Sequence, residues 1–114
     1  MLVLNVSDVI VCGHSECGDM KAALQTDRPR EVPNLNKWLH HAHAAAFRLE
    51  HEGALDRSLC AHAQFSQINL LVQLEHLASY AIVREGVGAL RLNGWWFDVA
   101  SCQMYAYDRT KRLF

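Results

Sequence analysis

The chain has 114 residues, of which 51% are hydrophobic and 20% are charged, a balance that excludes a disordered tail and predicts one globular domain. Its 11 basic and 12 acidic residues give a formal net charge of −1 without a long block of either sign, which argues against nucleic acid as a partner. The stretch MLVLNVSDVIVCG contains polar residues and is neither a membrane span nor a secretory signal, and the spacing of the four cysteines is not that of a disulfide scaffold. We therefore expect a reduced, cytoplasmic protein with no membrane partner.

The first predicted element is a strand. Residues 9–12 form an apolar, β-branched run of the kind that is buried on both faces in a parallel sheet, and Gly13 ends it. Ser15 is suited to cap a helix, with Glu16 in its first turn and good helix formers after it. The pattern predicts a strand, a tight turn and a helix, with the junction at residues 14–17.

Two amphipathic helices are predicted in the middle of the chain. After a polar loop over residues 26–33, apolar residues recur at three- and four-residue steps from Leu35 to Leu49, and this helix is expected to end near Gly53. A second helix is predicted from about Leu59 to Leu77. Its apolar face is wide enough to be packed on two sides.

The remaining sequence predicts a short helix and two strands. The segment SYAIVREGVGAL is typical of a short helix closed by Gly86 or Gly88. The aromatic-rich residues after it predict a strand over about 90–97, a turn near residue 100 and an edge strand over about 103–107. The order of these elements predicts a single α/β domain.

His14 and Cys17 are the first candidates for chemistry, because both residue types bind zinc and the two stand three apart beside a predicted helix start. On spacing alone, a packed cysteine and a hydrogen-bonded histidine explain the pair equally well. Cys60 and Cys102 are expected to be packed thiols. The other histidines lie in polar, helix-like surroundings and are expected at the surface: His40, His41, His43, His51, His62 and His76.

The segment VIVCGHSECGDMKAAL resembles the zinc-binding segment of the β-class carbonic anhydrases, which typically reads as an apolar strand, then C-G-H-x-x-C-G-G and a helix. Further matches follow in the family's order: Trp38 in a helix, Asn69 and Gln73 four residues apart, VRE, and the strand NGWWFD. The resemblance runs from about Val3 to Tyr107. Because the motifs keep their order, the sequence is identified as a member of that family.

The resemblance implies a fold and a set of zinc ligands. The fold would be α/β, a mainly parallel sheet flanked by helices, in one partial domain over residues 1–114. His14 and Cys17 would be two of three protein ligands on zinc, with Gly13 and Gly18 beside them. In the family a Cys-x-Asp-x-Arg segment upstream supplies the third ligand and an Asp-Arg pair, and this sequence contains no such segment. We therefore expect the C-terminal portion of a β-carbonic anhydrase, truncated at its N-terminus.

Two residues are candidates for a substitute third ligand. Cys12 is the nearest thiol, although a strand buried on both faces would hold it in the core. Asp19 offers a carboxylate oxygen and stands where the family usually has a second glycine, although its helical position would turn it toward solvent.

The family is a class of zinc lyases that hydrate carbon dioxide reversibly to bicarbonate, for which zinc supplies hydroxide at neutral pH. The resemblance thus implies zinc, carbon dioxide and bicarbonate as ligands. It also implies a homo-oligomer, a dimer or larger, because loss of the upstream half would leave a strand edge unpaired.

Three functions remain open from the sequence. The first is a carbonic anhydrase that is active only if a longer chain or a partner restores the missing ligand and the Asp-Arg pair. The second is a non-catalytic domain of the same fold that serves in assembly and binds zinc weakly or not at all. The third is redox sensing through Cys12 and Cys17.

Overall fold

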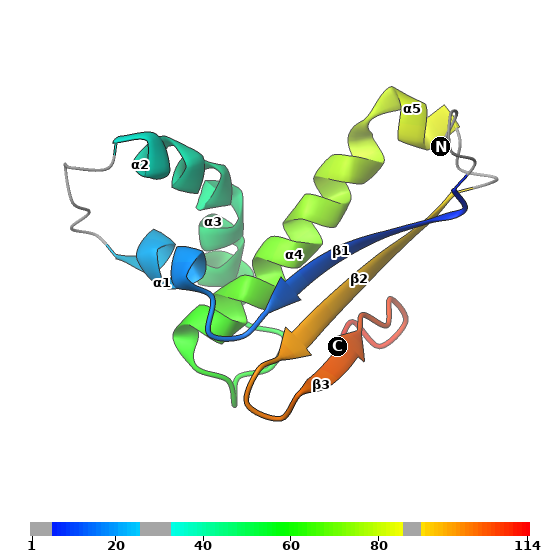
Figure 1. Ribbon diagram of the computed structural model, residues 1–114. Helices are drawn as coiled ribbons and strands as arrows, with labels where there is room; N and C mark the ends of the chain where they lie inside the picture. Colours follow the sequence, from blue (N-terminus) through cyan, green and yellow to red (C-terminus); the bar gives the residue numbers. More distant parts are fainter. Residues whose placement is uncertain (1–5, 26–32, 86–89) are drawn as a thin grey trace.

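The computed structural model describes residues 6–25, 33–85 and 90–114. Within these ranges a three-stranded sheet lies against a long helix, α4 (Ala61–Ser79), which crosses one face of the sheet (Figure 1). On its other side α4 contacts α1 (Gly18–Leu24) and α3 (His43–Glu52). The arrangement confirms the predicted α/β class, with α4 as the element that both layers share.

The sheet has the order β1 (Asp8–His14), β2 (Arg91–Asp98) and β3 (Gln103–Ala106). β1 and β2 are parallel, whereas β2 and β3 are antiparallel, so β3 is the edge strand that the sequence predicts. The parallel register pairs the last residue of β1, His14, with Phe97 near the end of β2. The carboxyl ends of the two strands therefore meet at one edge of the sheet.

The prediction that β1 is buried on both faces is wrong. Its residues alternate between exposed and half-buried along the whole strand, because α4 covers only one of its faces. Val11 packs against the core on the covered face, whereas Ile10 on the other face is 44% exposed. Cys12 lies on that open face as well, so it is an exposed thiol and not the core residue that the apolar run predicts.

The single helix predicted after Pro33 is interrupted. The structure has α2 (Pro33–Leu39), a 3-10 turn η1 (His40–Ala42) and then α3. Ala42 in the turn and Ala45 after it both pack in the same core cluster, so the interruption leaves the predicted apolar face continuous. α3 ends at Gly53 as predicted, and the φ of 84° there is a conformation that glycine adopts without strain.

Not all of the predicted elements can be compared with the structure. The residues 26–32 of the predicted polar loop lie outside the described ranges, as do the glycines expected to close the short helix, Gly86 and Gly88. The short helix itself is α5 (Ala81–Glu85).

α4 is packed on two sides, as its wide apolar face predicts. Phe65 and Ile68 are buried in the cluster that α4 shares with α1 and α3. Leu70, Leu71 and Leu74 are buried in a second cluster together with Trp96 of β2. The helix therefore joins the two hydrophobic clusters of the described chain into one framework.

Glycines on the inner face of the sheet set how closely α4 approaches it. A Cβ on Gly94 would lie 2.7 Å from Cδ2 of Leu70 and 2.8 Å from Cδ1 of Leu74. A Cβ on Gly13 would lie 3.3 Å from Cδ1 of Leu70. The absence of side chains at these two positions allows α4 to lie directly over the end of β1.

Candidate functional site

The connection between β1 and α1 consists of Ser15, Glu16 and Cys17. The prediction that Ser15 caps α1 is wrong, because the residue at the cap position is Cys17, and its side chain makes no capping hydrogen bond. Glu16 lies before the helix and not in its first turn, with a left-handed φ of 56°. The connection is thus a turn of its own, and other parts of the chain hold it.

Ser15 is buried, and its hydroxyl group joins the turn to the end of β2. Ser15 Oγ donates a hydrogen bond to Asp98 Oδ1 at 3.1 Å and accepts one from the Val99 backbone N–H at 2.8 Å. The Ser15 backbone N–H donates to the Phe97 carbonyl oxygen at 2.9 Å. Ser101 donates a further hydrogen bond to Asp98 at 2.6 Å. The final aspartate of NGWWFD therefore helps to fix the turn that carries the candidate ligands.

The hydrogen bonds to Asp98 predict that the free energy of unfolding depends on pH. The hydrogen bonds that Asp98 accepts from Ser101 and Ser15 hold the pKa of its carboxyl group below its usual value. Because the folded-state pKa is lower than the unfolded value of about 3.9, this stabilisation is complete above that value and is lost as the pH falls through the folded-state pKa. We expect Asp98→Asn to destabilise the chain most at neutral pH, with a difference from the unsubstituted chain that shrinks toward pH values of about 3.

Urea unfolding of both proteins at a series of pH values between about 3 and 7 would measure this difference. A difference in unfolding free energy that stays constant across the whole series would contradict the assigned role of Asp98.

A second set of hydrogen bonds holds the end of β1 against α4. Ser66 of α4 is buried, and its Oγ donates to the His14 carbonyl oxygen at 2.9 Å. Trp96 Nε1 donates to the same Ser66 Oγ at 3.1 Å. These bonds satisfy buried polar groups of β1, β2 and α4 at one point, which fixes the position of His14.

The ring of His14 is oriented by its own turn. His14 Nδ1 lies 2.7 Å from the carbonyl oxygen of Ser15. A carbonyl oxygen can only accept a hydrogen bond, so Nδ1 carries a hydrogen and donates it, and in the neutral ring Nε2 then has a lone pair. This tautomer is the one that a histidine needs in order to bind a metal ion through Nε2.

Cys17 borders a hollow of about 470 Å³ between α1, η1 and α4. Its thiol is free and half-buried. Polar side chains that line the same hollow include Asp19, Asn69, Gln73 and His76. Gln73 Nε2 donates a hydrogen bond to Asn69 Oδ1 at 3.3 Å. The amide pair that the family resemblance singled out thus faces the same space as Cys17.

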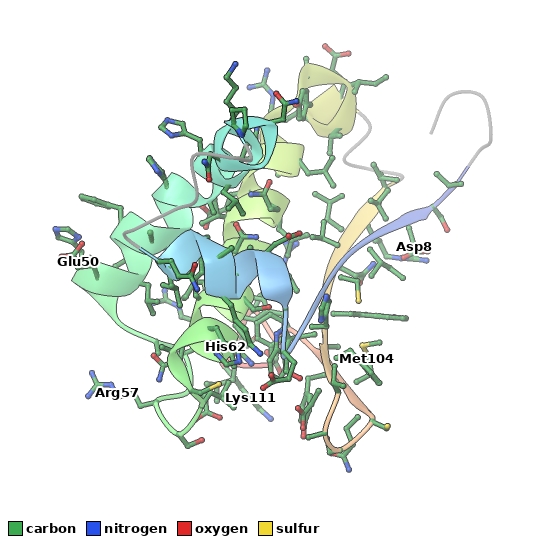
Figure 2. All side chains as sticks on the ribbon, turned by 60° about the vertical axis from the view of Figure 1, so that its left-hand side comes forward. Asp8, Glu50, Arg57, His62, Met104 and Lys111 are labelled. Atoms are coloured by element: carbon green, nitrogen blue, oxygen red, sulfur yellow. The ribbon has the colours of Figure 1, made fainter. Side chains whose placement is uncertain are left out.

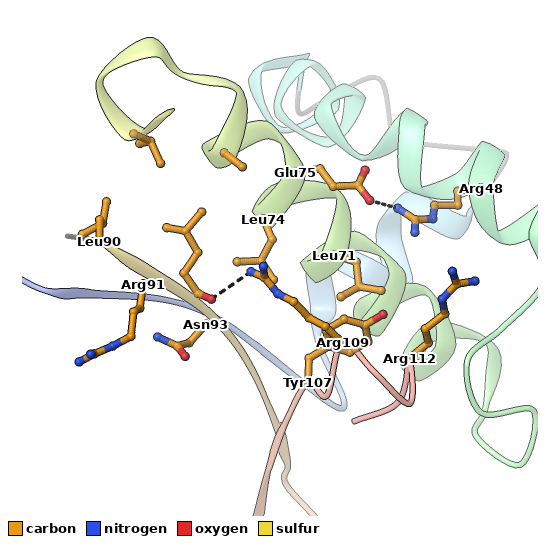
Figure 3. Close-up of a pocket in the computed structure, with 13 residues that line it drawn as sticks. Arg48, Leu71, Leu74, Glu75, Leu90, Arg91, Asn93, Tyr107, Arg109 and Arg112 are labelled. Atoms are coloured by element: carbon orange, nitrogen blue, oxygen red, sulfur yellow. Dashed lines mark hydrogen bonds and ion pairs between the residues drawn. The ribbon is translucent and has the colours of Figure 1, made fainter. Parts of the chain in front are cut away.

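A larger hollow of about 690 Å³ lies between α4, β2 and the C-terminal segment (Figure 3). Its lining residues include four arginines, and three of them bind groups of this chain. Arg48 binds Glu75 at 2.6 Å, and Arg109 donates to the Leu92 carbonyl oxygen at 3.2 Å, as the dashed lines in Figure 3 show. Arg91 binds Asp8 across the first pair of the β1–β2 register. These arginines serve internal contacts, and no residue of the β1–α1 connection lines this hollow.

Asp19 and Cys12, the two candidates for a substitute ligand, lie on different elements. Asp19 is exposed in the first turn of α1, and Cys12 is exposed on the open face of β1. A Cβ on Gly18 would meet no atom within 4 Å, so the start of α1 is open on that side. The roles of Asp19 and Cys12 as metal ligands, and of Gly18 as a neighbour of the metal site, remain predictions.

Across the described ranges, one group of three metal-binding side chains has its ligand atoms within 4.8 Å of one another, and it consists of Glu16, Cys60 and His62. Neither His14 nor Cys17 belongs to it. Sequence reasoning missed this group, although the Cys-x-His spacing at the start of α4 was a signal that a metal-ligand search would have found.

The expected positions of the other cysteines and histidines are partly corrected. Cys60 and Cys102 are exposed and not packed, because the loop before α4 and the β2–β3 turn leave both thiols at the surface. His62 is half-buried, with 22% of its side chain exposed. The remaining histidines of the predicted surface set are exposed, as expected: His40, His41, His43, His51 and His76. In the described part of the chain, the helices are too short or too polar to cross a membrane.

Residues 1–104 match the profile of the carbonic anhydrase family. A carbonic anhydrase of Pseudomonas aeruginosa PAO1 is 36% identical over 119 residues, a match that covers 98% of this chain and 51% of the relative. Carbonic anhydrase 1 of Escherichia coli O157:H7 is 33% identical over 113 residues, with 97% of this chain and 51% of the relative covered. The chain thus spans about half the length of these curated relatives.

Solved structures share the fold over most of this chain. The β-carbonic anhydrase CcaA superposes with a TM-score of 0.81 at 28% identity, covering 96% of this chain and 50% of the other. The β-carbonic anhydrase CafA of Aspergillus fumigatus gives a TM-score of 0.78 at 27% identity, covering 94% and 51%. A structure from a study of two tetrameric β-carbonic anhydrases of Sordaria macrospora has the same fold, with a TM-score of 0.76 at 24% identity and coverage of 92% and 54%.

Proposed function

The chain belongs to the β-class carbonic anhydrase family, and from this premise we propose that it takes part in the zinc-dependent, reversible hydration of carbon dioxide to bicarbonate. Because the chain spans about half the length of its relatives, the proposal rests on what its own residues contribute. That contribution is a prepared pair of ligands, His14 and Cys17, on a turn held by α4 and β2.

The hydrogen bond between His14 Nδ1 and the Ser15 carbonyl oxygen is the observation that supports a zinc site most directly. It leaves Nε2 with a lone pair that can bind zinc, and the free, half-buried thiol of Cys17 follows three residues later. The two side chains therefore fit as zinc ligands. When bound, zinc would supply the chemistry that the hydration of carbon dioxide needs, which is a source of hydroxide at neutral pH.

A catalytic zinc site uses three protein ligands and keeps one position open. The described residues bring no third ligand together with His14 and Cys17, so we place the third ligand outside them, on another segment or on a partner chain. The hollow beside Cys17, with the amides of Asn69 and Gln73 on its wall, suits a small polar ligand such as bicarbonate. In this arrangement the turn binds the metal and the amides orient the substrate.

We also propose that the protein forms a homo-oligomer. β1 ends the sheet within the described residues, and its open face exposes Ile10 and Cys12. An exposed strand edge with apolar neighbours favours association with another chain. The free cysteines support a cytoplasmic location, and the contacts of α4 with both layers support one domain over residues 1–114.

Cys17→Ala is expected to test the metal site. We expect this variant to lose about one equivalent of zinc per chain, because a thiolate ligand is removed. Cys102→Ala is the control, because Cys102 is also a free cysteine but is exposed at the β2–β3 turn. Zinc analysis of protein purified without a histidine tag measures the difference. Full zinc retention in Cys17→Ala, with the control also unchanged, would contradict the proposed ligand.

Activity is tested by complementation. A fragment that carries the family's Cys-x-Asp-x-Arg segment would be added to the chain, and carbon dioxide hydration would be followed by stopped flow. We expect hydration that requires both the fragment and Cys17. A fragment that binds the chain and yet restores no hydration would count against the catalytic proposal.

The separation of His14 and Cys17 from any third described ligand also supports a second proposal, that of a non-catalytic domain serving in assembly. Under this proposal the folded chain associates but holds no zinc at Cys17. Sedimentation measures the association, and the two functions are distinguished by whether Cys17→Ala loses zinc and whether the complemented chain hydrates carbon dioxide.

A further inference from the structure

The start of α4 meets the β1–α1 connection at a group of three side chains that the proposed hydration site does not use. Glu16 comes from the connection, whereas Cys60 and His62 come from the first residues of α4. Figure 2 shows His62 at this end of α4, on the side of α1. We propose that Glu16, Cys60 and His62 form a second metal site, which binds Zn²⁺ through one oxygen, one sulfur and one nitrogen atom.

The distances from His62 Nε2 to the other two ligand atoms are close to those around one tetrahedral ion. Cys60 Sγ lies 3.4 Å from His62 Nε2, and Glu16 Oε1 lies 3.2 Å from the same nitrogen. Metal bonds of about 2.0–2.1 Å to nitrogen, 2.3 Å to sulfur and 2.0–2.2 Å to oxygen place tetrahedral ligands about 3.3–3.6 Å apart. The two separations from Nε2 lie within about 0.2 Å of this range, and all three ligand atoms lie within 4.8 Å of one another, so rearrangement of the side chains alone can admit the ion.

The contacts around the His62 ring favour a metal site over a proton relay. In a relay of thiol, imidazole and carboxylate, the thiol approaches one ring nitrogen and the carboxylate approaches the other. Here Glu16 and Cys60 both approach Nε2 of His62, and Cys60 Sγ is farther from Nδ1, at 3.7 Å. Because Sγ is nearly as close to Nδ1 as to Nε2, the sulfur atom stands beside the ring, and a rotation of the Cys60 side chain toward Nε2 would let one ion bind all three ligand atoms, which lie within 4.8 Å of one another.

The surrounding contacts leave the three ligand atoms available to an ion. Lys21 Nζ binds Glu16 Oε2 at 2.6 Å, which leaves Oε1 directed toward His62. Cys60 is the residue at the N-cap of α4 and makes no capping hydrogen bond, so its sulfur atom is not bound by the helix. The helix N-terminus also favours the negative charge that a thiolate and a carboxylate bring.

The three ligand atoms indicate which ion binds, and the exposure of their side chains indicates that one side of the ion stays open. Hard ions such as Mg²⁺ and Ca²⁺ prefer oxygen ligands throughout, whereas a mixture of nitrogen, sulfur and oxygen suits Zn²⁺. Glu16 and Cys60 are exposed and His62 is half-buried, so the site is open to solvent on one side. Three protein ligands and an open side leave a fourth position for water or another small ligand.

The test is a titration of the reduced, full chain with Co²⁺, which replaces zinc and whose absorption reports tetrahedral geometry and a thiolate ligand. Three substitutions address the site: Cys60→Ser, His62→Ala and Glu16→Gln. Controls of the same residue types are Cys102→Ser and His51→Ala, both at exposed positions on other elements. Cys17→Ser separates this site from the proposed hydration site, and urea midpoints without metal show which variants remain folded.

We expect Cys60→Ser and His62→Ala each to weaken the binding of one equivalent of Co²⁺ at least about tenfold and to remove or alter its thiolate absorption. Glu16→Gln, which preserves the shape of the side chain, is expected to weaken the same equivalent, whereas the controls and Cys17→Ser leave it in place. Unchanged affinity in folded Glu16→Gln and His62→Ala would overturn the proposal. Loss of the same equivalent in Cys17→Ser would also overturn it, because the ion would then belong to the turn of His14. Failure of the hydration assays does not affect these outcomes.

Discussion

Replacing Trp96 by alanine is expected to lower the free energy of unfolding by about 3–5 kcal/mol. The side chain is only 3% exposed and packs between the sheet and α4, so its removal leaves a cavity in the cluster that contains Leu70 and Leu74. The substitution also removes the hydrogen bond from Nε1 to Ser66, which in turn holds the His14 carbonyl oxygen. A domain of ordinary stability, about 5–15 kcal/mol, would keep little margin after this loss.

The neighbouring tryptophan provides the control for this prediction. Trp95 lies on the opposite face of β2 and is 38% exposed, so Trp95→Ala is expected to cost no more than about 1 kcal/mol. Urea unfolding followed by circular dichroism measures both variants. Trp96→Phe isolates the hydrogen bond, because it preserves most of the ring, and is expected to cost about 1 kcal/mol. Equal losses in Trp95→Ala and Trp96→Ala would contradict the packing described for β2.

Gly94→Ala is expected to destabilise the chain by about 1–3 kcal/mol, although it adds a single methyl group. The new Cβ would meet Leu70 Cδ2 at 2.7 Å and Leu74 Cδ1 at 2.8 Å. Both methyl groups are the ends of flexible side chains. Because both leucines are buried, however, they can move away from the new Cβ only if α4 or β2 shifts. The cost therefore arises from overpacking between the helix and the sheet.

Gly18→Ala is the matched control, since no atom lies within 4 Å of the position that its Cβ would take. Because alanine restricts the unfolded chain and favours helix, this variant is expected to be unchanged or stabilised by up to about 1 kcal/mol. Gly13→Ala, with its nearest contact at 3.3 Å, is expected to fall between the two. Thermal or urea unfolding of the three variants gives the order. A Gly94→Ala variant as stable as Gly18→Ala would show that α4 can move away from the sheet at little cost.

The sequence predicted correctly the elements whose type and burial follow from their own residue pattern. The apolar face of α4 is wide in the sequence and is buried on two sides in the structure. The alternation and aromatic content of β2 and β3 placed both strands and the edge position of β3. For the candidate site, the sequence predicts His14 and Cys17 as ligands, which stays a prediction, and it held no information on the hydrogen bond that fixes the tautomer of His14.

The errors concern features that depend on distant partners. An apolar run such as residues 9–12 shows that a strand is present, but the number of its covered faces depends on which elements pack against it. Ser15 has the composition of a helix cap, yet its hydroxyl group binds Asp98, 83 residues away. Glu16 and His62 are separated by 46 residues, so their meeting with Cys60 follows from the fold and not from a motif.

The parallel pairing of β1 with β2 also determines when the turn can acquire its shape. Asp8 and Arg91, which pair at the start of this register, are 83 residues apart, so the strands can join only by closing a loop that contains most of the chain. Closing so long a loop makes the pairing a late and slow step of folding compared with the formation of α4. During synthesis on the ribosome, Ser15 therefore cannot bind Asp98 until β2 has emerged. The turn with His14 and Cys17 takes its final form only after that point.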